Sequence, residues 1–282
     1  MNVGLAFAAN IASFLLAWVT PGRPAFLARA PRSGLRFYVH HRDVVGRHIA
    51  KYGAHEPALP TWINSHLASA PRGLVLDIGA NVGWHALHAA RHDNVELVVA
   101  FEPDAFNAWL LDRNVGINGV EKIVTIGSAV GMAGGMARLS RYKASNNGRH
   151  SLAVDHGLSS RLVPVTTLDD AVERLGLTGR PVPLVKIDVE GYEPAVISGG
   201  LNTLRRADAI VTEFSPELSA AGGLSLQAMI DQLDGLGFRP HRFGSGVSLE
   251  VMPLSDLRSL AEQIDVIWLR ERPADVLPAS PS

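Results

Sequence analysis

The sequence predicts an α/β fold in which helices cover both faces of a mostly parallel sheet. From residue 74 onward, short apolar runs alternate with helical stretches, an order that is typical of parallel sheets. The first apolar run, residues 74–78, leads directly into a glycine-bearing turn over residues 79–83. In open sheets of this kind, the ligand site lies at the carboxyl ends of the strands, beside such a turn. These two observations favour a Rossmann-like fold that binds a nucleoside.

The expected elements follow one another in a regular order after a less regular beginning. Ahead of the glycine turn, a strand is predicted over residues 34–39 and helices over residues 44–52 and 57–70. The later strands are predicted over residues 74–78, 95–101, 123–126, 184–188, 207–214, 238–243 and 265–270. The helices between them are predicted over residues 82–91, 104–115, 166–175, 193–199 and 226–236. Asp104 is placed to cap one of these helices, and Thr166 or Thr167 another.

Residues 128–165 interrupt the alternation of strands and helices. Two strands are expected there, over residues 136–142 and 161–165, with a polar, turn-prone stretch over residues 144–151 between them. We interpret this region as a hairpin inserted into the helical layer of the sheet. This hairpin carries four polar residues, which either line a substrate pocket or form an exposed turn: Asn146, Asn147, Arg149 and His150.

Length and composition limit the classes of protein that need to be considered. The chain has 282 residues, of which 47% are hydrophobic and 19% charged, a balance typical of globular proteins. We divide it into an N-terminal helical or cap segment (1–70), a main domain that contains the alternating strands and helices (71–272) and a disordered tail (273–282). The formal net charge of -1 provides no global attraction for nucleic acid. The absence of cysteine excludes disulfides, thiolate nucleophiles and cysteine-ligated zinc.

The first apolar segment, residues 3–19, allows three interpretations. Asn10 and Ser13 interrupt it, and no Lys or Arg precedes it as in a secretory signal. It is also shorter than the ~20 residues of a membrane span. We expect a helix that packs on the domain or on a second subunit, which would make the protein a homodimer. A peripheral membrane anchor and a cleaved signal are the alternatives.

The glycine turn and two carboxylates around it favour a particular nucleoside ligand. Glycines at Gly79 and Gly83 let the backbone approach a ligand closely, and Glu102 ends the next strand, where it can accept hydrogen bonds from ribose hydroxyls. Pro103 fixes the exit of the chain from that strand. A dinucleotide fingerprint needs glycine where this chain has Asn81. Asp77 would oppose a pyrophosphate but suits a ligand with an ammonium and a sulfonium, which favours S-adenosylmethionine over NAD.

Several ordered motifs resemble those of the FkbM family of methyltransferases. The resemblance covers roughly residues 40–240. It rests on the segments 75–83, 101–104, 165–170 and 186–191, on Glu213, and on an upstream lead-in that includes Arg42, Asp43, His55, Glu56 and Pro57. The family commonly has a tyrosine at His55 and a small hydroxyl residue at His85. The resemblance implies a class I methyltransferase sheet of about seven strands with the last one antiparallel. It also implies S-adenosylmethionine as cofactor, and methyl transfer to a hydroxyl of a small metabolite, a sugar or glycan, or a natural product.

Residues that bind the cofactor are expected around the glycine turn and at the neighbouring strand ends. On the resemblance, Ser128 and Ala129 follow the third strand, where such sheets meet the adenine, and Glu56 belongs to the lead-in. The full expected set is Glu56, Asp77, Gly79, Ala80, Asn81, Gly83, Glu102, Pro103, Ser128, Ala129 and Asp188.

Catalytic residues are expected at the carboxyl end of the fourth strand. If that strand continued, alternation would place Lys186, Asp188 and Glu190 on one face, where charges are costly unless they pair. Asp188 is the first choice for a base that accepts the hydroxyl proton, or for a contact with the methionine end of the cofactor, and Glu190 is the second choice. Lys186 would hold these carboxylates or lower the pKa of the acceptor, and Glu213 ends the fifth strand near the same rim. The alternative is a salt-bridged cluster that only orders the loop.

No metal is assigned from the sequence, although Asp188, Glu190 and Glu213 offer the oxygen ligands of a magnesium-like ion. The helical spacing of His85, His88 and His92 fits a packed or solvated helix face equally well. An NAD-dependent oxidoreductase and a non-catalytic binding protein remain the competing functions. We expect a cytoplasmic protein whose partner is a small-molecule or glycan acceptor rather than nucleic acid, because the sequence has no basic stripe interleaved with aromatic residues.

Overall fold

The computed structural model describes residues 3–20, 25–41, 43–141 and 150–271. The predicted tail over residues 273–282 lies outside these ranges, as do Asn146, Asn147 and Arg149 of the predicted hairpin turn. Among the helices of these ranges, none combines the length and the apolar character that crossing a membrane requires.

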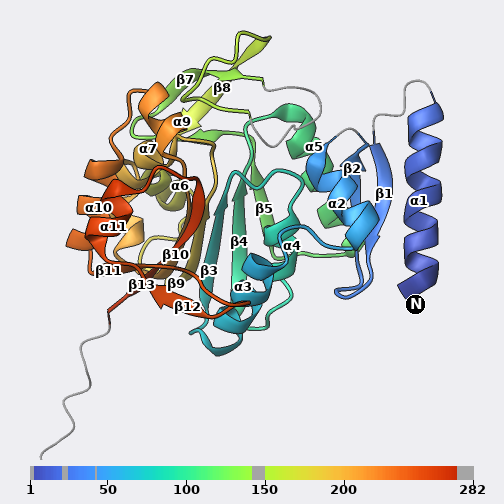
Figure 1. Cartoon of the computed structure of the whole chain (residues 1–282), viewed down its shortest axis with the longest axis horizontal. Coiled ribbons are helices and arrows are strands. Elements are labelled where there is room, and N and C mark those ends of the chain that lie inside the picture. The colour runs from blue at the N-terminus through green and yellow to red at the C-terminus, as the bar shows by residue number, and fades with distance from the viewer. Residues whose placement is uncertain (1–2, 21–24, 42, 142–149, 272–282) are drawn as a thin grey trace, which may run out of the picture.

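An eight-stranded sheet with helices on both faces forms the centre of the molecule (Figure 1). In spatial order its strands are β12 (Leu249–Val251), β11 (Phe238–Phe243), β13 (Ile264–Arg270), β10 (Ala207–Phe214), β9 (Val182–Ile187), β3 (Gly73–Ile78), β4 (Val95–Phe101) and β5 (Ile123–Ile126). The run from β10 to β5 is parallel, and β13 is antiparallel to both of its neighbours. The antiparallel last strand is therefore confirmed, and the short β12 adds an edge strand that was not predicted.

Two apolar layers hold the helices against the sheet, one on each face. One layer packs sheet residues such as Leu76 and Ile187 against α6, α7, α8, α10 and α11. The other packs sheet residues such as Val98 and Val211 against α3, α4 and α5. The bounds are α3 (Ala58–Ser69), α4 (Trp84–Ala89), α5 (Ala105–Asn118), α6 (Leu168–Arg174), α7 (Glu193–Ser198), α8 (Leu201–Leu204), α9 (Pro216–Ala221), α10 (Leu226–Gly235) and α11 (Leu254–Ser259).

Two of the predicted helix caps are present in the structure. Asp104 Oδ1 accepts hydrogen bonds from the backbone N–H groups of Phe106 and Asn107 at the start of α5. Thr167 Oγ1 accepts from the backbone N–H of Asp170 in α6. Both side chains satisfy backbone donors that have no partner inside the helix.

The inserted region forms a small sheet of its own above the carboxyl edge of the main sheet. Its strands are β6 (Ala129–Val130), β8 (Ser160–Thr166) and β7 (Gly135–Ser140), in that spatial order. The hairpin of β7 and β8 was predicted, whereas β6 has only two residues and gave no recognisable pattern. The Ser151 hydroxyl donates to the carbonyl oxygen of Glu190 at 2.7 Å and ties this insert to the end of β9.

The N-terminal extension contains a strand hairpin as well as the predicted helices. It comprises α1 (Val3–Val19), β1 (Ala25–Ala30), β2 (Leu35–His40) and α2 (Val44–Tyr52). The sequence analysis predicted β2 but not β1. In Figure 1 the hairpin lies beside α5, and α1 lies outermost, against β1.

Asparagine side chains block both outer edges of this hairpin. On the β1 edge, Asn10 of α1 bonds both the N–H and the C=O of Arg29, at 2.7 and 2.9 Å. On the β2 edge, Asn114 of α5 does the same with Tyr38, at 2.6 and 3.1 Å, and Asn118 with Arg36, at 2.9 and 2.7 Å. Each amide thus replaces the backbone of a further strand.

Replacing Asn114 with alanine should destabilise the protein more than replacing Asn118. Asn114 is fully buried and also bonds the carbonyl oxygen of Val82, so Asn114→Ala leaves buried backbone groups unpaired and should cost about 2–4 kcal/mol. The bonds of Asn118 with Arg36 are exposed, so water can replace them and Asn118→Ala should cost less than about 1 kcal/mol. Urea unfolding of both variants measures the difference. Equal losses in the two variants would mean that burial does not decide how much these bonds contribute.

Candidate active site

The glycine turn brings the ends of β3 and β9 into direct contact. Gly79 has φ 80°, and a Cβ atom there would lie 1.9 Å from the carbonyl oxygen of Asp188. The backbone N–H of Asp188 donates to the carbonyl oxygen of Ile78 at 3.0 Å. Two loops that carry site residues therefore touch through a position that only glycine can occupy. Asn81 also lies in the left-handed region, with φ 51°, which asparagine tolerates better than most residues.

Glu102 is held in place by the turn that it faces. Its Oε2 accepts from the backbone N–H of Asn81 at 2.8 Å, and its Oε1 accepts from the N–H of Asp104 at 2.9 Å. Burial raises the pKa of Glu102 to about 8, although these backbone donors act in the opposite direction. The carboxyl group is thus rigid, desolvated and directed at the glycine turn.

A cavity of about 270 Å³ lies between the glycine turn and the end of β9. Most of the predicted site residues line it, namely Glu56, Gly79, Ala80, Asn81, Glu102, Pro103, Ser128, Ala129, Lys186, Asp188, Glu190 and Glu213. Asp77 and Gly83 do not belong to this lining. Asp77 is buried behind it, and Gly83 is the N-cap of α4, with φ 86°.

The predicted reason for the clustering of Lys186, Asp188 and Glu190 is wrong. Strand β9 ends at Ile187, and Glu190 adopts a left-handed conformation with φ 53°, so strand alternation does not place these residues. A turn does so instead, because Glu193 Oε1 accepts from the N–H groups of Val189 and Gly191 at 2.9 and 3.3 Å. The sequence analysis did not identify Glu193 as a residue that shapes the site.

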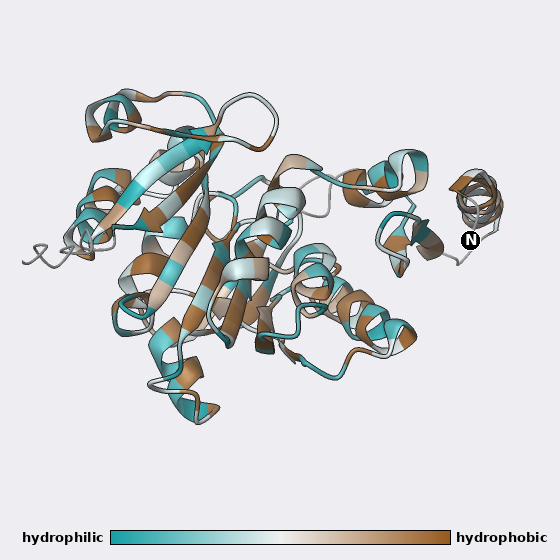
Figure 2. Ribbon diagram, turned by 90° about the horizontal axis from the view of Figure 1, so that it is seen from below, coloured by the Kyte–Doolittle hydropathy of each residue, from teal (hydrophilic) through white to brown (hydrophobic). Residues whose placement is uncertain are grey.

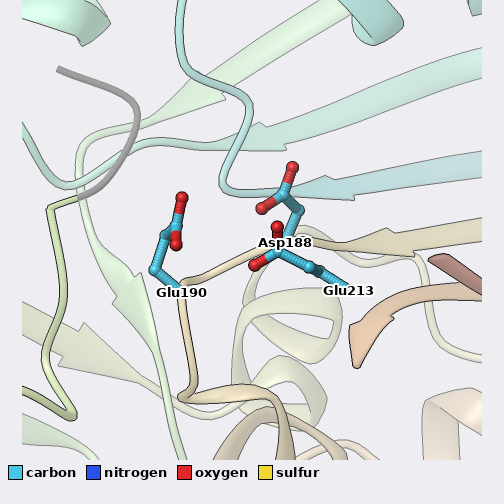
Figure 3. A group of neighbouring side chains, drawn as sticks. All are labelled: Asp188, Glu190 and Glu213. Atoms are coloured by element: carbon cyan, nitrogen blue, oxygen red, sulfur yellow. The ribbon is translucent and has the colours of Figure 1, made fainter. Parts of the chain in front are cut away.

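Three carboxylates converge on the rim of the cavity, from Asp188, Glu190 and Glu213 (Figure 3). One oxygen of each lies within 4.8 Å of the others. Burial raises the pKa of Glu213 to about 10, with further contributions from the charges of Asp188 and Glu190. Glu213 therefore carries a proton at neutral pH. Three oxygen donors in this arrangement are also of the type that hard divalent cations prefer.

Lys186 is the buried cation beside this cluster. Its Nζ donates to Asp188 Oδ2 at 3.0 Å and lies 3.9 Å from Asp77 Oδ1. Burial lowers the pKa of Lys186, but the charges of Asp188 and Asp77 outweigh that effect and raise it overall. The ammonium thus stays charged, and it orients Asp188 within the cavity wall.

Two histidines that the sequence analysis did not assign to the site lie beside the predicted residue Glu56, one in α4 and one in the loop before α3. His55 Nε2 lies 3.4 Å from Glu56 Oε1, and His85 Nε2 lies 4.0 Å from Glu56 Oε2. Burial lowers the pKa of His55 to about 4 and that of His85 well below its usual value, so both rings are neutral. These rings shape the pocket wall and add no charge to it.

Other lining residues were also missed, because nothing in their local sequence marks them. Trp84, Tyr192 and Gln263 line the cavity, and the amide of Gln263 donates to Glu213. His150, for which the sequence analysis left a pocket and an exposed turn open, also belongs to the lining. Near β10, burial and the charges of Glu56 and Asp188 raise the pKa of Asp265 to about 7. These residues come from segments far apart in the chain, so only the fold brings them together.

Comparison with known proteins gives one family and several distant relatives. Residues 77–240 match the methyltransferase FkbM domain. The 2-O-methyltransferase NoeI of Sinorhizobium fredii (strain NBRC 101917 / NGR234) is 27% identical over 187 residues, which are 59% of this chain and 73% of NoeI. Among solved structures, the METTL16 methyltransferase domain matches at 12% identity with a TM-score of 0.48, over 96% of this chain and 83% of that one. The precorrin-6y C5,15-methyltransferase of Geobacter metallireducens GS-15 matches at 10% identity with a TM-score of 0.41, over 76% and 88%.

The protonated state of Glu213 predicts a pH-dependent effect of its substitution. A carboxyl whose folded-state pKa is raised favours folding at low pH, and this contribution is lost as the pH rises from the ordinary value of 4.5 toward about 10. Glu213→Gln cannot ionise and escapes this loss. Between about pH 5 and pH 9, the free energy of unfolding of Glu213→Gln should rise relative to that of the wild type by up to ~1.4 kcal/mol per pH unit. Urea unfolding across this range tests it.

The matched control is Glu217→Gln, which removes an exposed carboxyl group from the nearby helix α9. If the curves of Glu213→Gln and the wild type ran parallel, Glu213 would be ionised in the folded protein at neutral pH, and the assignment of its proton would be wrong.

Proposed function

The chain belongs to the FkbM methyltransferase family, and from this premise we propose that it transfers a methyl group from S-adenosylmethionine to a hydroxyl of a small metabolite, a sugar or a glycan. Its fold is the Rossmann-like sheet of class I methyltransferases. One observation carries the proposal. A single cavity is bordered by the glycine turn and Glu102 on one side and by Asp188, Glu190 and Glu213 on the other.

The charge of the cavity supports a cationic ligand. Burial raises the pKa of six acidic groups in or beside it, which are Glu56, Asp77, Glu102, Glu193, Glu213 and Asp265. Within the described chain, Lys186 is the buried ammonium among them. A positive ligand would stabilise the ionised carboxylates and would be attracted in return. S-adenosylmethionine carries a sulfonium and an ammonium, whereas the pyrophosphate of NAD would add negative charge.

The residues that line the cavity fit S-adenosylmethionine, and each group of them would contact a different part of it. When bound, S-adenosylmethionine supplies an electrophilic methyl group on a positively charged sulfur. Glu102 would accept hydrogen bonds from the ribose hydroxyls, because its carboxylate is fixed beside the turn. The backbone of residues 79–81 would form the floor under the ligand, since these residues line the cavity beside Glu102.

Asp188 is the best candidate for the base that accepts the proton of the acceptor hydroxyl. Its side chain is about one-third exposed, and Lys186 orients its carboxylate from behind. Glu213 already holds a proton at neutral pH, so it cannot serve as the base and is suited to donate a hydrogen bond to the acceptor instead. Glu190, on the same rim, would complete the acceptor site and remains the second choice for the base.

A second cavity of about 370 Å³ supports a hydroxylated acceptor. It shares Glu190 and Gln263 with the first cavity and is also lined by His156, Ser215 and Glu217. Polar side chains of this kind can pair with the hydroxyl groups of a sugar. That the relative NoeI is by name a 2-O-methyltransferase agrees with methylation at oxygen.

Calorimetry with the purified protein tests the cofactor. S-adenosylmethionine and S-adenosylhomocysteine should bind saturably and NAD should not. Glu102→Gln should weaken binding by about 1–3 kcal/mol, because a charged hydrogen-bond acceptor is lost. Glu96→Gln is the matched control, since Glu96 lies on β4, the strand that Glu102 follows, but pairs with Arg72 and Arg180 at the surface. Preference for NAD, or no binding at all, would refute the proposed cofactor.

Methyl transfer to a panel of sugars and glycans tests the base. Asp188→Asn should lower kcat by about 10²–10⁴-fold, the usual contribution of a general base. Affinity for S-adenosylhomocysteine, measured separately, reports any role of Asp188 in cofactor binding. Asp231→Asn is the control, because Asp231 pairs with Arg258 at the surface of α10. A kcat that stays at the wild-type level would exclude Asp188 as the base.

A further inference from the structure

Helix α1 is apolar on the face that it turns away from the protein. Its inward stripe contains the buried residues Ala6, Asn10 and Ala17. On the rest of its surface, seven large apolar side chains are each more than half exposed, and they are Val3, Leu5, Ile11, Leu15, Leu16, Trp18 and Val19. The described residues contain sixteen exposed large hydrophobic side chains, so this one helix holds almost half of them.

The polarity of α1 is the reverse of that expected for a surface helix. A surface helix normally directs its apolar stripe inward and its polar residues toward water, whereas α1 buries an asparagine and exposes leucines. Figure 2 shows this helix at the edge of the molecule, beside the hairpin. Monomeric soluble proteins rarely expose a contiguous apolar patch of this extent, so we expect the outer face of α1 to have an apolar partner.

The contacts between α1 and the hairpin determine which face of the helix points away from the protein. The amide of Asn10 pairs with both backbone groups of Arg29 in β1, and Phe14 packs edge-on against Phe26 with ring centroids 5.5 Å apart. These contacts hold the helix along the hairpin, with one side against the protein. The apolar side therefore forms a ridge on the outside of the hairpin.

The charge around α1 indicates the chemistry of its partner. Residues 1–52 contain seven of the 26 Lys and Arg residues of the chain but one of its 27 Asp and Glu residues. Arg32 and Lys51 are exposed. Arg32 follows Pro31 and Lys51 lies two residues before Gly53, where a Cβ atom would lie 2.8 Å from Pro31 and 3.3 Å from Phe7 of α1. The strongly basic N-terminal part thus contrasts with a remainder of the chain in which acidic residues predominate.

From this combination we propose that α1 lies in the plane of an anionic lipid surface and holds the protein there. The outer side chains of α1 enter the boundary between headgroups and acyl chains, and Arg32 and Lys51 pair with the phosphates of the lipids. An apolar face bordered by basic residues is the usual pattern of helices that lie on membranes. A two-fold contact between two α1 helices fits less well, because it would bring two strongly basic segments together.

Flotation of the full chain with lipid vesicles tests this proposal. The protein should float with vesicles that contain phosphatidylglycerol and much less with vesicles of phosphatidylcholine alone, and added salt should weaken the binding. Leu15→Ser combined with Leu16→Ser should lower the partition coefficient at least about tenfold, because two apolar side chains no longer enter the lipid. Arg32→Glu combined with Lys51→Glu should abolish the preference for phosphatidylglycerol.

The control carries two serine substitutions at equally exposed apolar positions elsewhere, Leu162→Ser in β8 and Val251→Ser in β12, and should bind vesicles like the wild type. Circular dichroism and urea unfolding confirm that each variant is folded. Light scattering gives the mass in solution. If the wild type did not bind vesicles, the proposal would be wrong. If the wild type were a dimer in solution, and the variant with Leu15→Ser and Leu16→Ser were a 30.2 kDa monomer, the outer face of α1 would instead bind a second copy of the chain. Equal binding of the control and the leucine variant would also overturn the proposal.

Discussion

The contact between Gly79 and the carbonyl oxygen of Asp188 is the constraint on which the site depends. Because β3 and β9 are adjacent and parallel, their loops leave the sheet side by side, and the cavity exists only if these loops can touch. A side chain at residue 79 would occupy the position of the neighbouring backbone. The same glycine therefore closes the floor of the cavity and sets the position of Asp188.

Around that contact, the acidic side chains outnumber the basic side chains that could neutralise them. Lys186 neutralises part of their charge, and a proton on Glu213 removes more. Such an arrangement is costly in the absence of a ligand, because buried carboxyl groups must either hold protons or remain unpaired. A site of this kind gives up stability for the ability to attract positive charge, a common compromise where binding requires desolvated polar groups.

The sequence predicted most of the framework, because the framework depends on local patterns. Alternating apolar runs located β3, β4, β9 and β10, and the glycine turn with Glu102 located one side of the cavity. The failures have physical causes. The short β6 carries too little pattern to recognise, and the clustering of Glu190 with Asp188 results from the turn held by Glu193 rather than from strand alternation. Residues such as Gln263 and His55 reach the cavity only through the tertiary fold.

The asparagine bonds of the N-terminal hairpin also affect the order in which the chain can fold during synthesis. Asn10 and Arg29 are 19 residues apart, so α1 can protect the β1 edge soon after both have left the ribosome. Asn114 follows Tyr38 by 76 residues, so the β2 edge stays open until α5 has been made. Throughout that interval an unpaired strand edge is available to other nascent chains. The hairpin is thus made before α5 but completed only after it.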